Sequence, residues 1–189
     1  MPVLSGKDIR RLLKLKPPLI EGWLDLDEQV QANGFDLTLR DVALVQSRGQ
    51  IAVDNRDRLV SGLAPLSFDK TGFLDLAPGV YMITYNEIVH LPKHIMALGR
   101  PRSSLLRCGV SVGTAVWDAG YEGRSQSLLI VHNPHGFRVQ RNARITQLVF
   151  MTLTGESEGY SGVYQGEKPP AGSHRAGCPR RRRRRLRHP

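Results

Sequence analysis

The sequence predicts a mainly β protein, an all-β barrel or sandwich that begins with one short helix. Segments rich in Val, Ile, Thr, Tyr and Phe recur at roughly 8–12-residue spacing, and Gly, Pro, Asn and Asp separate them. Helical spacing of apolar residues is found in a stretch near the start. A chain of 189 residues is long enough to bury one full core, so we expect one domain.

The helix is expected over residues 5–16. Ser5 is a favourable N-cap residue, and Asp8 lies in the first turn. Apolar residues then follow helical spacing until Pro17, which cannot continue the helix.

The predicted strands follow in short segments. Asn-Pro-His-Gly at 133–136 is typical of a hairpin turn between two of them. The polar, Arg- and Asp-rich segment 46–69 has no pattern that assigns it. The clearest strands are expected at residues 35–39, 42–46, 79–85, 95–99, 127–132, 136–140 and 145–153.

The positive charge is concentrated at the C-terminal end. The formal net charge is +10; nine of the 27 Lys and Arg residues lie in 168–189, and none of the 17 Asp and Glu residues do. Residues 1–167 are therefore nearly neutral, and we expect them to form the folded domain, followed by a disordered Arg-rich tail at 168–189. The tail is either a solvated extension or a segment that binds nucleic acid by neutralising phosphates.

Several features bear on the compartment. The chain has no apolar run of about 18 residues, so we expect no membrane span. Its N-terminus lacks the apolar stretch and cleavage site of a signal peptide. Cys108 and Cys178 are the only cysteines, and Cys178 lies in the tail. A disulfide framework is therefore not expected, and a reducing cytoplasm is the expected compartment.

Arg102, Ser103 and Ser104 form a candidate phosphate-binding group. A guanidinium beside two hydroxyls and their backbone N–H groups suits a polyphosphate, because charge-assisted bidentate hydrogen bonds fix its oxygens. The same residues also suit the start of a helix that has Pro101 before it and Leu105 in the core.

Asp118 and Tyr121 lie three residues apart in a Gly-rich bend that precedes the strand at 127–132. A carboxylate in this position could orient and deprotonate water, and the ring could stack on a sugar or a base. An ordinary turn is the alternative interpretation, since Asp-Ala-Gly-Tyr is acceptable turn chemistry.

Gln147 lies on a strand whose alternation places it on one face with Ile145 and Val149. A Gln among apolar neighbours is either at an edge or hydrogen-bonded to a specific partner. After this strand, residues 158–167 combine glycines, hydroxyls and an amide. That composition is typical of a mobile flap that could close over phosphates, and also of an ordinary flexible terminus.

The histidines do not form a zinc site. His132 and His135 form one pair and His90 and His94 another, and neither belongs to a Cys/His/carboxylate cluster. Both halves of the zinc deaminase signature, His-x-Glu and Pro-Cys-x-x-Cys, are missing.

Taken in order, five segments resemble the motifs of the trimeric dUTPase and dCTP deaminase superfamily, with archaeal-type dUTPases the most similar branch. The opening segment 4–13 and the region 76–92 also resemble the deaminase branch, so the resemblance covers nearly all of residues 1–167. The five segments are Ala-Asn-Gly-Phe-Asp-Leu (32–37), Arg-Ser-Ser-Leu (102–105), residues 114–123, Arg-Ile-Thr-Gln-Leu (144–148) and Gly-Tyr-Ser-Gly-Val-Tyr-Gln-Gly (159–166).

The resemblance implies a distorted β-barrel or jelly-roll-like subunit and a homotrimer whose sites are shared between chains. It implies Mg²⁺ that is held through the substrate's triphosphate and water, with no direct protein ligand. Asp36 would be a structural or metal-proximal carboxylate.

The resemblance also implies the roles of the site residues. Asp118 would activate water, Tyr121 would pack on the deoxyribose, and residues 156–167 would form the flap. The substrate would be bound by residues from three motifs and the flap, namely Arg102, Ser103, Ser104, Thr114, Ala115, Tyr121, Gln147, Tyr160, Tyr164 and Gln165.

Leu128 favours hydrolysis over deamination within this superfamily. In the deaminases, a Glu lies ten residues after the carboxylate of the bend, and this Glu shuttles protons during attack on the cytosine ring. This chain has Leu128 at that position. The expected reaction is therefore attack of water on the α-phosphorus of dUTP, giving dUMP and pyrophosphate. Such an enzyme limits uracil in DNA and supplies dUMP for thymidylate synthesis. The alternatives are dCTP deamination, with Glu122 as a substitute acid/base, and nucleic-acid binding through the tail.

Overall fold

The structure is a computed structural model, and it describes residues 2–167. The predicted disorder of the tail concerns residues 168–189, which lie outside the described residues. The helices of the described part are α1 (Gly6–Leu12), α2 (Leu26–Gln29), α3 (Ser103–Arg107) and the 3₁₀ helix η1 (Asn55–Asp57).

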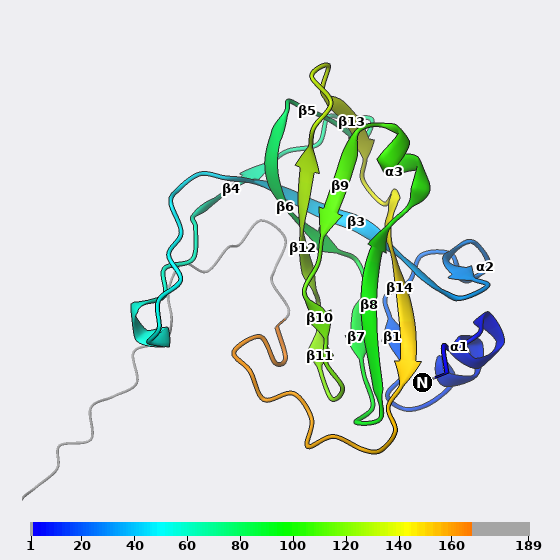
Figure 1. The fold of residues 1–189 in the computed structure, drawn as a ribbon. Helices are drawn as coiled ribbons and strands as arrows, with labels where there is room; N and C mark the ends of the chain where they lie inside the picture. Colours follow the sequence, from blue (N-terminus) through cyan, green and yellow to red (C-terminus); the bar gives the residue numbers. More distant parts are fainter. Residues whose placement is uncertain (1, 168–189) are drawn as a thin grey trace, which may run out of the picture.

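The described part is mainly β, as the sequence predicts (Figure 1). Its largest sheet has the strand order β10-β8-β14-β3-β6-β12-β9, and β2 and β4 add to β3. Two small sheets, β1-β7-β11 and β13-β5, complete it. The strands are β1 (Ile20–Glu21), β2 (Val30–Gln31), β3 (Gly34–Val45), β4 (Leu63–Leu66), β5 (Phe73–Leu76), β6 (Gly79–Tyr85), β7 (Ile88–His90), β8 (Ile95–Pro101), β9 (Val110–Gly113), β10 (Val116–Trp117), β11 (Glu122–Gly123), β12 (Gln126–Val131), β13 (Phe137–Gln140) and β14 (Arg144–Thr152).

The large sheet curls into a distorted half-barrel. Its two outermost strands, β9 and β10, are consecutive in the chain, and only Thr114 and Ala115 connect them. Such a short connection requires the two edges of the sheet to come close together, so the sheet bends back on itself. This finding confirms the predicted barrel-like fold and places Thr114 and Ala115 at its seam.

The predicted N-terminal helix is confirmed at its start and shorter at its end. Ser5 caps α1 with a full capping box, because its hydroxyl accepts from the Asp8 N–H and the Asp8 carboxylate accepts from the Ser5 N–H. The helix ends at Leu12, four residues before the predicted end. Pro17 disfavours helical backbone at the residue before it, and the Leu12 carbonyl accepts from Leu19 across the turn.

Two predictions about strands differ from the structure. The strands expected at 35–39 and 42–46 are one strand, β3, with an irregular register between Leu39 and Asp41. The turn at 133–136 forms, since the Gly136 N–H donates to the Asn133 carbonyl at 3.0 Å. The prediction that it closes a hairpin is wrong, because β12 pairs with β6 and β9 whereas β13 pairs with β5.

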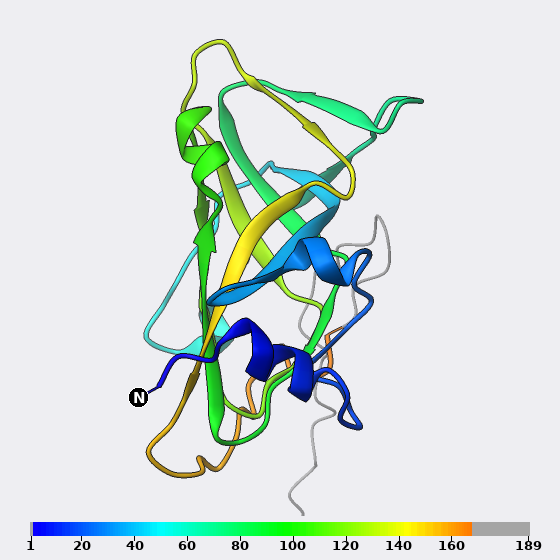
Figure 2. The ribbon, with the colours of Figure 1, turned by 90° about the vertical axis from the view of Figure 1, so that its right-hand side faces the viewer.

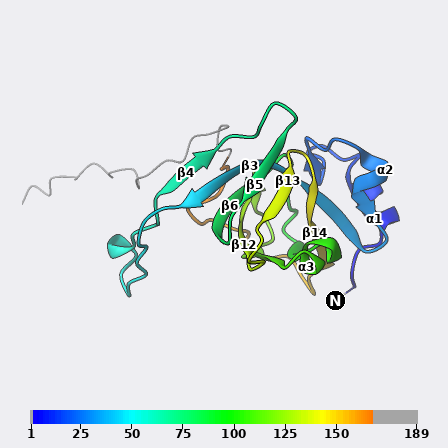
Figure 3. The ribbon, with the colours of Figure 1, turned by 90° about the horizontal axis from the view of Figure 1, so that it is seen from above.

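Residues 46–62 of the unassigned segment 46–69 form an arm that projects from the barrel on the side away from α1 and α2, and the rest of that segment contains β4 (Figure 3). Reciprocal backbone hydrogen bonds between Gln50 and Leu59 hold its two sides together. Ile51 is 84% exposed and Val53 is 110% exposed, so apolar side chains at its end touch little of the described part.

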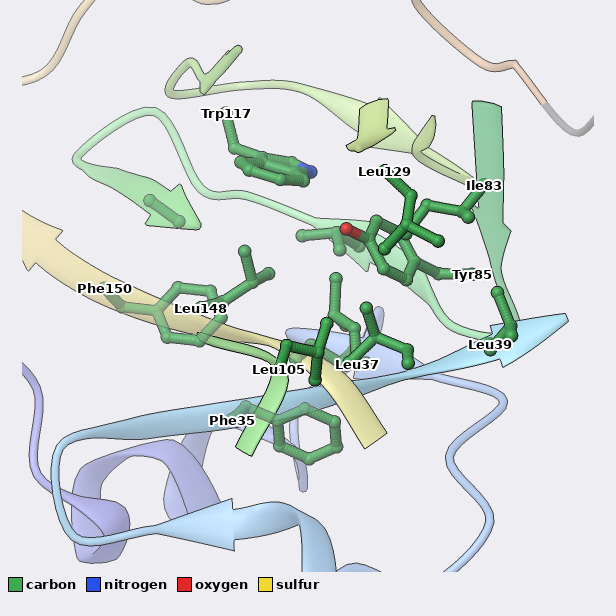
Figure 4. Packing of buried hydrophobic residues seen from close by; sticks show 14 of the residues in the cluster. Phe35, Leu37, Leu39, Ile83, Tyr85, Leu105, Trp117, Leu129, Leu148 and Phe150 are labelled. Carbon is green, nitrogen blue, oxygen red and sulfur yellow. The ribbon is translucent and has the colours of Figure 1, made fainter. Parts of the chain in front are cut away.

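The core fills the inside of the barrel (Figure 4). Phe35, Leu37 and Leu39 of β3 and Leu148 and Phe150 of β14 point into it. Helices α1 and α2 both pack on β3 from outside (Figure 2), so this strand is buried on both faces. Among the described residues, no helix is long and apolar enough to span a membrane.

A buried carboxylate, Glu87, ties three segments together in this core. Glu87 is 1% exposed and accepts hydrogen bonds from the Gln29 amide at 2.7 Å, the Thr38 hydroxyl at 2.6 Å and the Thr38 N–H at 2.9 Å. Burial raises the pKa of the Glu87 carboxyl above its ordinary value of 4.5, although these hydrogen bonds oppose the shift. The network fixes α2 and β3 relative to the turn between β6 and β7.

We expect Glu87→Gln to remove one component of the pH dependence of stability. A carboxyl with a raised folded-state pKa contributes stability fully below its unfolded pKa, and this contribution is lost as pH rises through the folded pKa. As the pH rises above 4.5, the ordinary pKa of a Glu carboxyl, the wild-type protein should therefore lose stability relative to the variant. The loss should be at most about 1.4 kcal/mol per pH unit. Urea unfolding of both proteins from about pH 4 to pH 8 measures this. A difference that does not change with pH would contradict it.

Candidate functional site

The candidate phosphate-binding residues Arg102, Ser103 and Ser104 lie where β8 ends and α3 begins. Arg102 is the N-cap residue of α3, and the Arg102 N–H is anchored to the Ile145 carbonyl of β14 at 3.0 Å. Ser103 and Ser104 form the first turn of the helix, and both are exposed. The start of α3 and the candidate phosphate-binding residues therefore coincide.

Asp36 holds the Arg102 side chain in place. The Asp36 carboxylate is 1% exposed; its Oδ2 lies 3.0 Å from Arg102 Nε and 3.8 Å from Arg144 Nη1. Burial raises the pKa of the Asp36 carboxyl, while the charges of Arg102 and then Arg144 lower it. Asp36 therefore forms an ion pair that holds the Arg102 guanidinium beside β3.

Gln147 faces the same surface from β14. It pairs with Arg100 of β8 on one side and with Asp36 of β3 on the other. Gln147 and Val149 are both half-buried and share one face, as predicted, but Ile145, which was expected on that face too, is 2% exposed. The register is irregular between Arg144 and Thr146, and this bulge turns Ile145 inward.

Thr114 and Ala115, at the barrel seam, lie close to this group. The Thr114 hydroxyl donates to the Gly99 carbonyl of β8 at 3.4 Å, next to Arg100. Leu128 pairs with Gly113 and points outward beside it, because the inward side of β12 is formed by alternate residues such as Leu129. An apolar side chain therefore stands beside the seam where a deaminase glutamate is expected.

Asp118 projects from the bend between β10 and β11. Its neighbours Trp117, Ala119 and Tyr121 are 5%, 6% and 8% exposed, whereas Asp118 is exposed. The Tyr121 N–H donates to the Asp118 carbonyl at 3.0 Å, which closes the turn. Burial raises the pKa of the Tyr121 hydroxyl, so the phenol stays neutral at physiological pH. The bend thus exposes the Asp118 carboxylate to solvent while the neighbouring side chains are buried.

The C-terminal segment 156–167 packs against this same bend. The Tyr160 N–H donates to the Ala119 carbonyl at 2.8 Å, and the Tyr160 ring meets the Tyr121 ring edge to face at 5.6 Å between centroids. The Gln165 amide accepts from the Glu122 N–H at 3.1 Å and donates to the Gly120 carbonyl at 3.0 Å. Tyr164 is 46% exposed beside these contacts.

Gly120 permits this close approach of the flap. It has a positive φ of +82°, and a Cβ there would lie 2.8 Å from the Gly159 Cα and 3.0 Å from the Tyr160 N. Any side chain would therefore be strained and would also displace the segment.

The predicted site residues fall into two groups. One lies near α3, which follows the end of β8, and the other lies at the bend between β10 and β11, beside the start of β8; Figure 1 shows these elements. Trp117 pairs with Ala97, so Asp118 is level with the start of β8, whereas Arg102 follows its end. Six residues of extended chain separate these levels, or about 20 Å at about 3.3 Å per residue. Within one chain, the candidate base Asp118 is therefore not close to the candidate phosphate-binding residue Arg102.

Glu122, the alternative acid/base, lies away from Leu128. Its Oε1 is 3.5 Å from His90 Nδ1, and His90 Nε2 is 3.4 Å from Glu21 Oε1. Within residues 2–167 no cluster of three or more His, Cys, Asp or Glu side chains could hold a metal ion.

Sequence reasoning missed three residues of these two groups. Arg144 shares the Asp36 carboxylate, Arg100 stands beside Gln147, and Ser125 hydrogen-bonds Trp117. The Arg100 position could have been suspected, because it belongs to the same Arg-Pro-Arg run as Arg102. The contact of Arg144 joins β14 to β3, which no local pattern indicates, and Ser125 acts through a hydrogen bond across the bend.

Residues 3–153 match the family model described as dCTP deaminase-like. The chain is 49% identical over 168 residues to a probable deoxyuridine 5'-triphosphate nucleotidohydrolase of Methanosarcina mazei, covering 88% of this chain and 98% of that protein. It is 49% identical over 167 residues to a protein of the same name from Archaeoglobus fulgidus, again covering 88% and 98%.

A solved structure shares the fold. The 2'-deoxycytidine 5'-triphosphate deaminase of Agrobacterium tumefaciens superposes with a TM-score of 0.60 at 24% sequence identity. The match covers 80% of this chain and 49% of that one.

Proposed function

The chain belongs to the dCTP deaminase-like family, and within that family we propose that it hydrolyses dUTP to dUMP and pyrophosphate. The observation that carries the choice of reaction is Leu128, which points outward beside the seam residue Gly113. Ring deamination needs a group that transfers protons, and a leucine transfers none. The archaeal relatives that bear the name of a dUTP nucleotidohydrolase support the same choice.

The proposed reaction uses Asp118 as the general base. Its carboxylate takes a proton from a water molecule, whose oxygen forms a bond to the α-phosphorus of dUTP. The bond from this phosphorus to the bridging oxygen breaks, and the electron pair leaves with pyrophosphate. Arg102, Ser103, Ser104 and Gln147 bind phosphate oxygens and stabilise the charge that develops on them. Tyr121 packs on the deoxyribose.

Mg²⁺ fits this site as a cation that the substrate carries. Asp36 is not available as a ligand, because its carboxylate faces two guanidinium groups and is 1% exposed. Phosphate oxygens and water suffice for Mg²⁺, which keeps several waters and needs no protein cage. When bound, the ion would neutralise charge on the phosphates.

A site shared between chains would join the two groups. Asp118 and Arg102 lie about 20 Å apart along β8. We therefore propose that the phosphate-binding residues of one copy face the Asp118 bend of another copy in a homotrimer. Val116 and Leu106, 49% and 58% exposed, and the apolar end of the arm are available for contacts between copies. The flap residues Tyr160, Tyr164 and Gln165 would then close over the nucleotide.

We propose residues 1–167 as the complete catalytic domain. Protein that ends at residue 167 should hydrolyse dUTP at the wild-type rate, because every proposed site residue precedes that point. If the tail binds nucleic acid, only the full chain should bind it, with an affinity that falls steeply with salt. Loss of hydrolysis on truncation would contradict this assignment. The proposed compartment remains the cytoplasm.

The direct test is pyrophosphate release from dUTP by the full-length protein. We expect release with Mg²⁺ present, loss of release on chelation, and recovery when Mg²⁺ is added again. Intact dUTP in the presence of Mg²⁺ would overturn the proposal.

A further inference from the structure

We propose that Ser125 is a positioning residue that holds the Asp118 bend in its reactive geometry. The inference rests on the proposed function, in which Asp118 is the general base. Ser125 lies in the short connection between β11 and β12, outside all five motifs of the resemblance, and it is 7% exposed.

The Ser125 hydroxyl links the two residues that enclose the bend. The Trp117 indole Nε1–H donates to Ser125 Oγ at 2.6 Å, and the Ser125 hydroxyl donates to Tyr121 Oη at 3.4 Å. Trp117 directly precedes Asp118, and Tyr121 follows it by three residues. One hydroxyl therefore accepts from one side of the bend and donates to the other.

The backbone around Ser125 is itself fixed to the barrel wall. The Ser125 carbonyl accepts from the Tyr85 N–H of β6 at 3.3 Å. The next residue back, Arg124, donates from its guanidinium to the Tyr85 carbonyl at 3.0 Å and to the Asn86 carbonyl. Tyr85 is fully buried, so Ser125 connects the bend to a residue of the core.

Asp118 depends on its neighbours for its position. Its carboxylate makes no hydrogen bond or ion pair with any residue in the described range, and the side chain is exposed. Its orientation is therefore set by the backbone of the bend, and that backbone is held by Trp117 and Tyr121. Loss of the Ser125 hydroxyl leaves the buried Trp117 N–H without its acceptor, and this favours rearrangement of the bend.

The test compares Ser125→Ala with Ser125→Thr, which keeps a hydroxyl at the same position. In Ser125→Ala we expect kcat for dUTP to fall by roughly 10²-fold with KM little changed, since a displaced base affects the chemical step more than binding. Ser125→Thr should retain most of the activity. Trp117→Phe, which removes only the indole donor, should reproduce the Ser125→Ala result.

The decisive measurement repeats Ser125→Ala in an Asp118→Asn background. If Ser125 acts through Asp118, the second change lowers the residual kcat little further; a purely structural role lowers it by the same factor in both backgrounds. Equal factors, or wild-type kcat in Ser125→Ala, would overturn the inference. Failure of the wild-type protein to hydrolyse dUTP would instead refute the proposed function, so the two failures are distinguishable.

Discussion

Asp118→Asn should lower kcat for dUTP hydrolysis by about 10²–10⁴-fold, the range that a general base contributes. The amide has nearly the same shape as the carboxylate but does not take a proton from water. Asp118 is exposed on a bend that buried neighbours hold, so the substitution should leave the fold intact. Steady-state release of pyrophosphate at saturating dUTP measures the effect.

The control for this variant is its stability and its affinity for substrate. The free energy of unfolding should change by less than about 0.5 kcal/mol, as for most surface substitutions. Binding of a non-hydrolysable dUTP analogue should also be retained. Near-wild-type kcat in a correctly folded Asp118→Asn protein would exclude Asp118 as the base.

Arg102→Gln should cost both activity and stability. Activity should fall by about 10²–10³-fold, the usual cost of removing a donor that stabilises developing charge. Stability should fall toward the lower end of about 3–5 kcal/mol, because Asp36 loses its nearer partner and keeps only Arg144 at 3.8 Å. Pyrophosphate release and urea unfolding measure the two effects separately.

The double variant Asp36→Asn with Arg102→Gln separates these two effects. It removes the buried charge together with its partner, so it should recover stability but not activity. The pH dependence supplies a second check. The Asp36 pKa rises further in Arg102→Gln, so the stability lost relative to wild type should shrink as pH falls through that pKa. Recovery of activity in the double variant would show that Arg102 does not bind phosphate.

A mixing experiment uses the same variants to test the shared site. Asp118→Asn and Arg102→Gln are each expected to be nearly inactive alone. When subunits of the two are exchanged, some mixed assemblies contain an intact Asp118 facing an intact Arg102. Activity should therefore reappear in the mixture if the site is shared. No recovery after confirmed exchange would place the site within one chain.

Much of the fold could be predicted because it depends on local signals. Ser5 with Asp8 forms a capping box, and β6 lies where its apolar pattern places it. Pairing between strands depends on distant segments, and there the prediction was wrong. The turn at 133–136 has good turn residues, yet it connects strands of two different sheets. The arm remained unassigned because its apolar residues pack on little of the described chain.

The candidate site was predictable in its residues but not in its arrangement. Motif order indicated Arg102, Asp118 and Gln147 without placing them relative to one another. The register of β10 on β8 separates the candidate base Asp118 from the phosphate-binding residue Arg102. Ser125 carries no local signal, because its role comes from a hydrogen bond to Trp117 across the bend.

One assay tests the central claim most directly: dUTP and dCTP offered side by side to the full-length protein with Mg²⁺, with pyrophosphate and ammonia measured in each. We predict pyrophosphate from dUTP and no ammonia from dCTP, because Leu128 replaces the acid/base that deamination needs. Ammonia from dCTP, with dUTP left intact, would contradict the account.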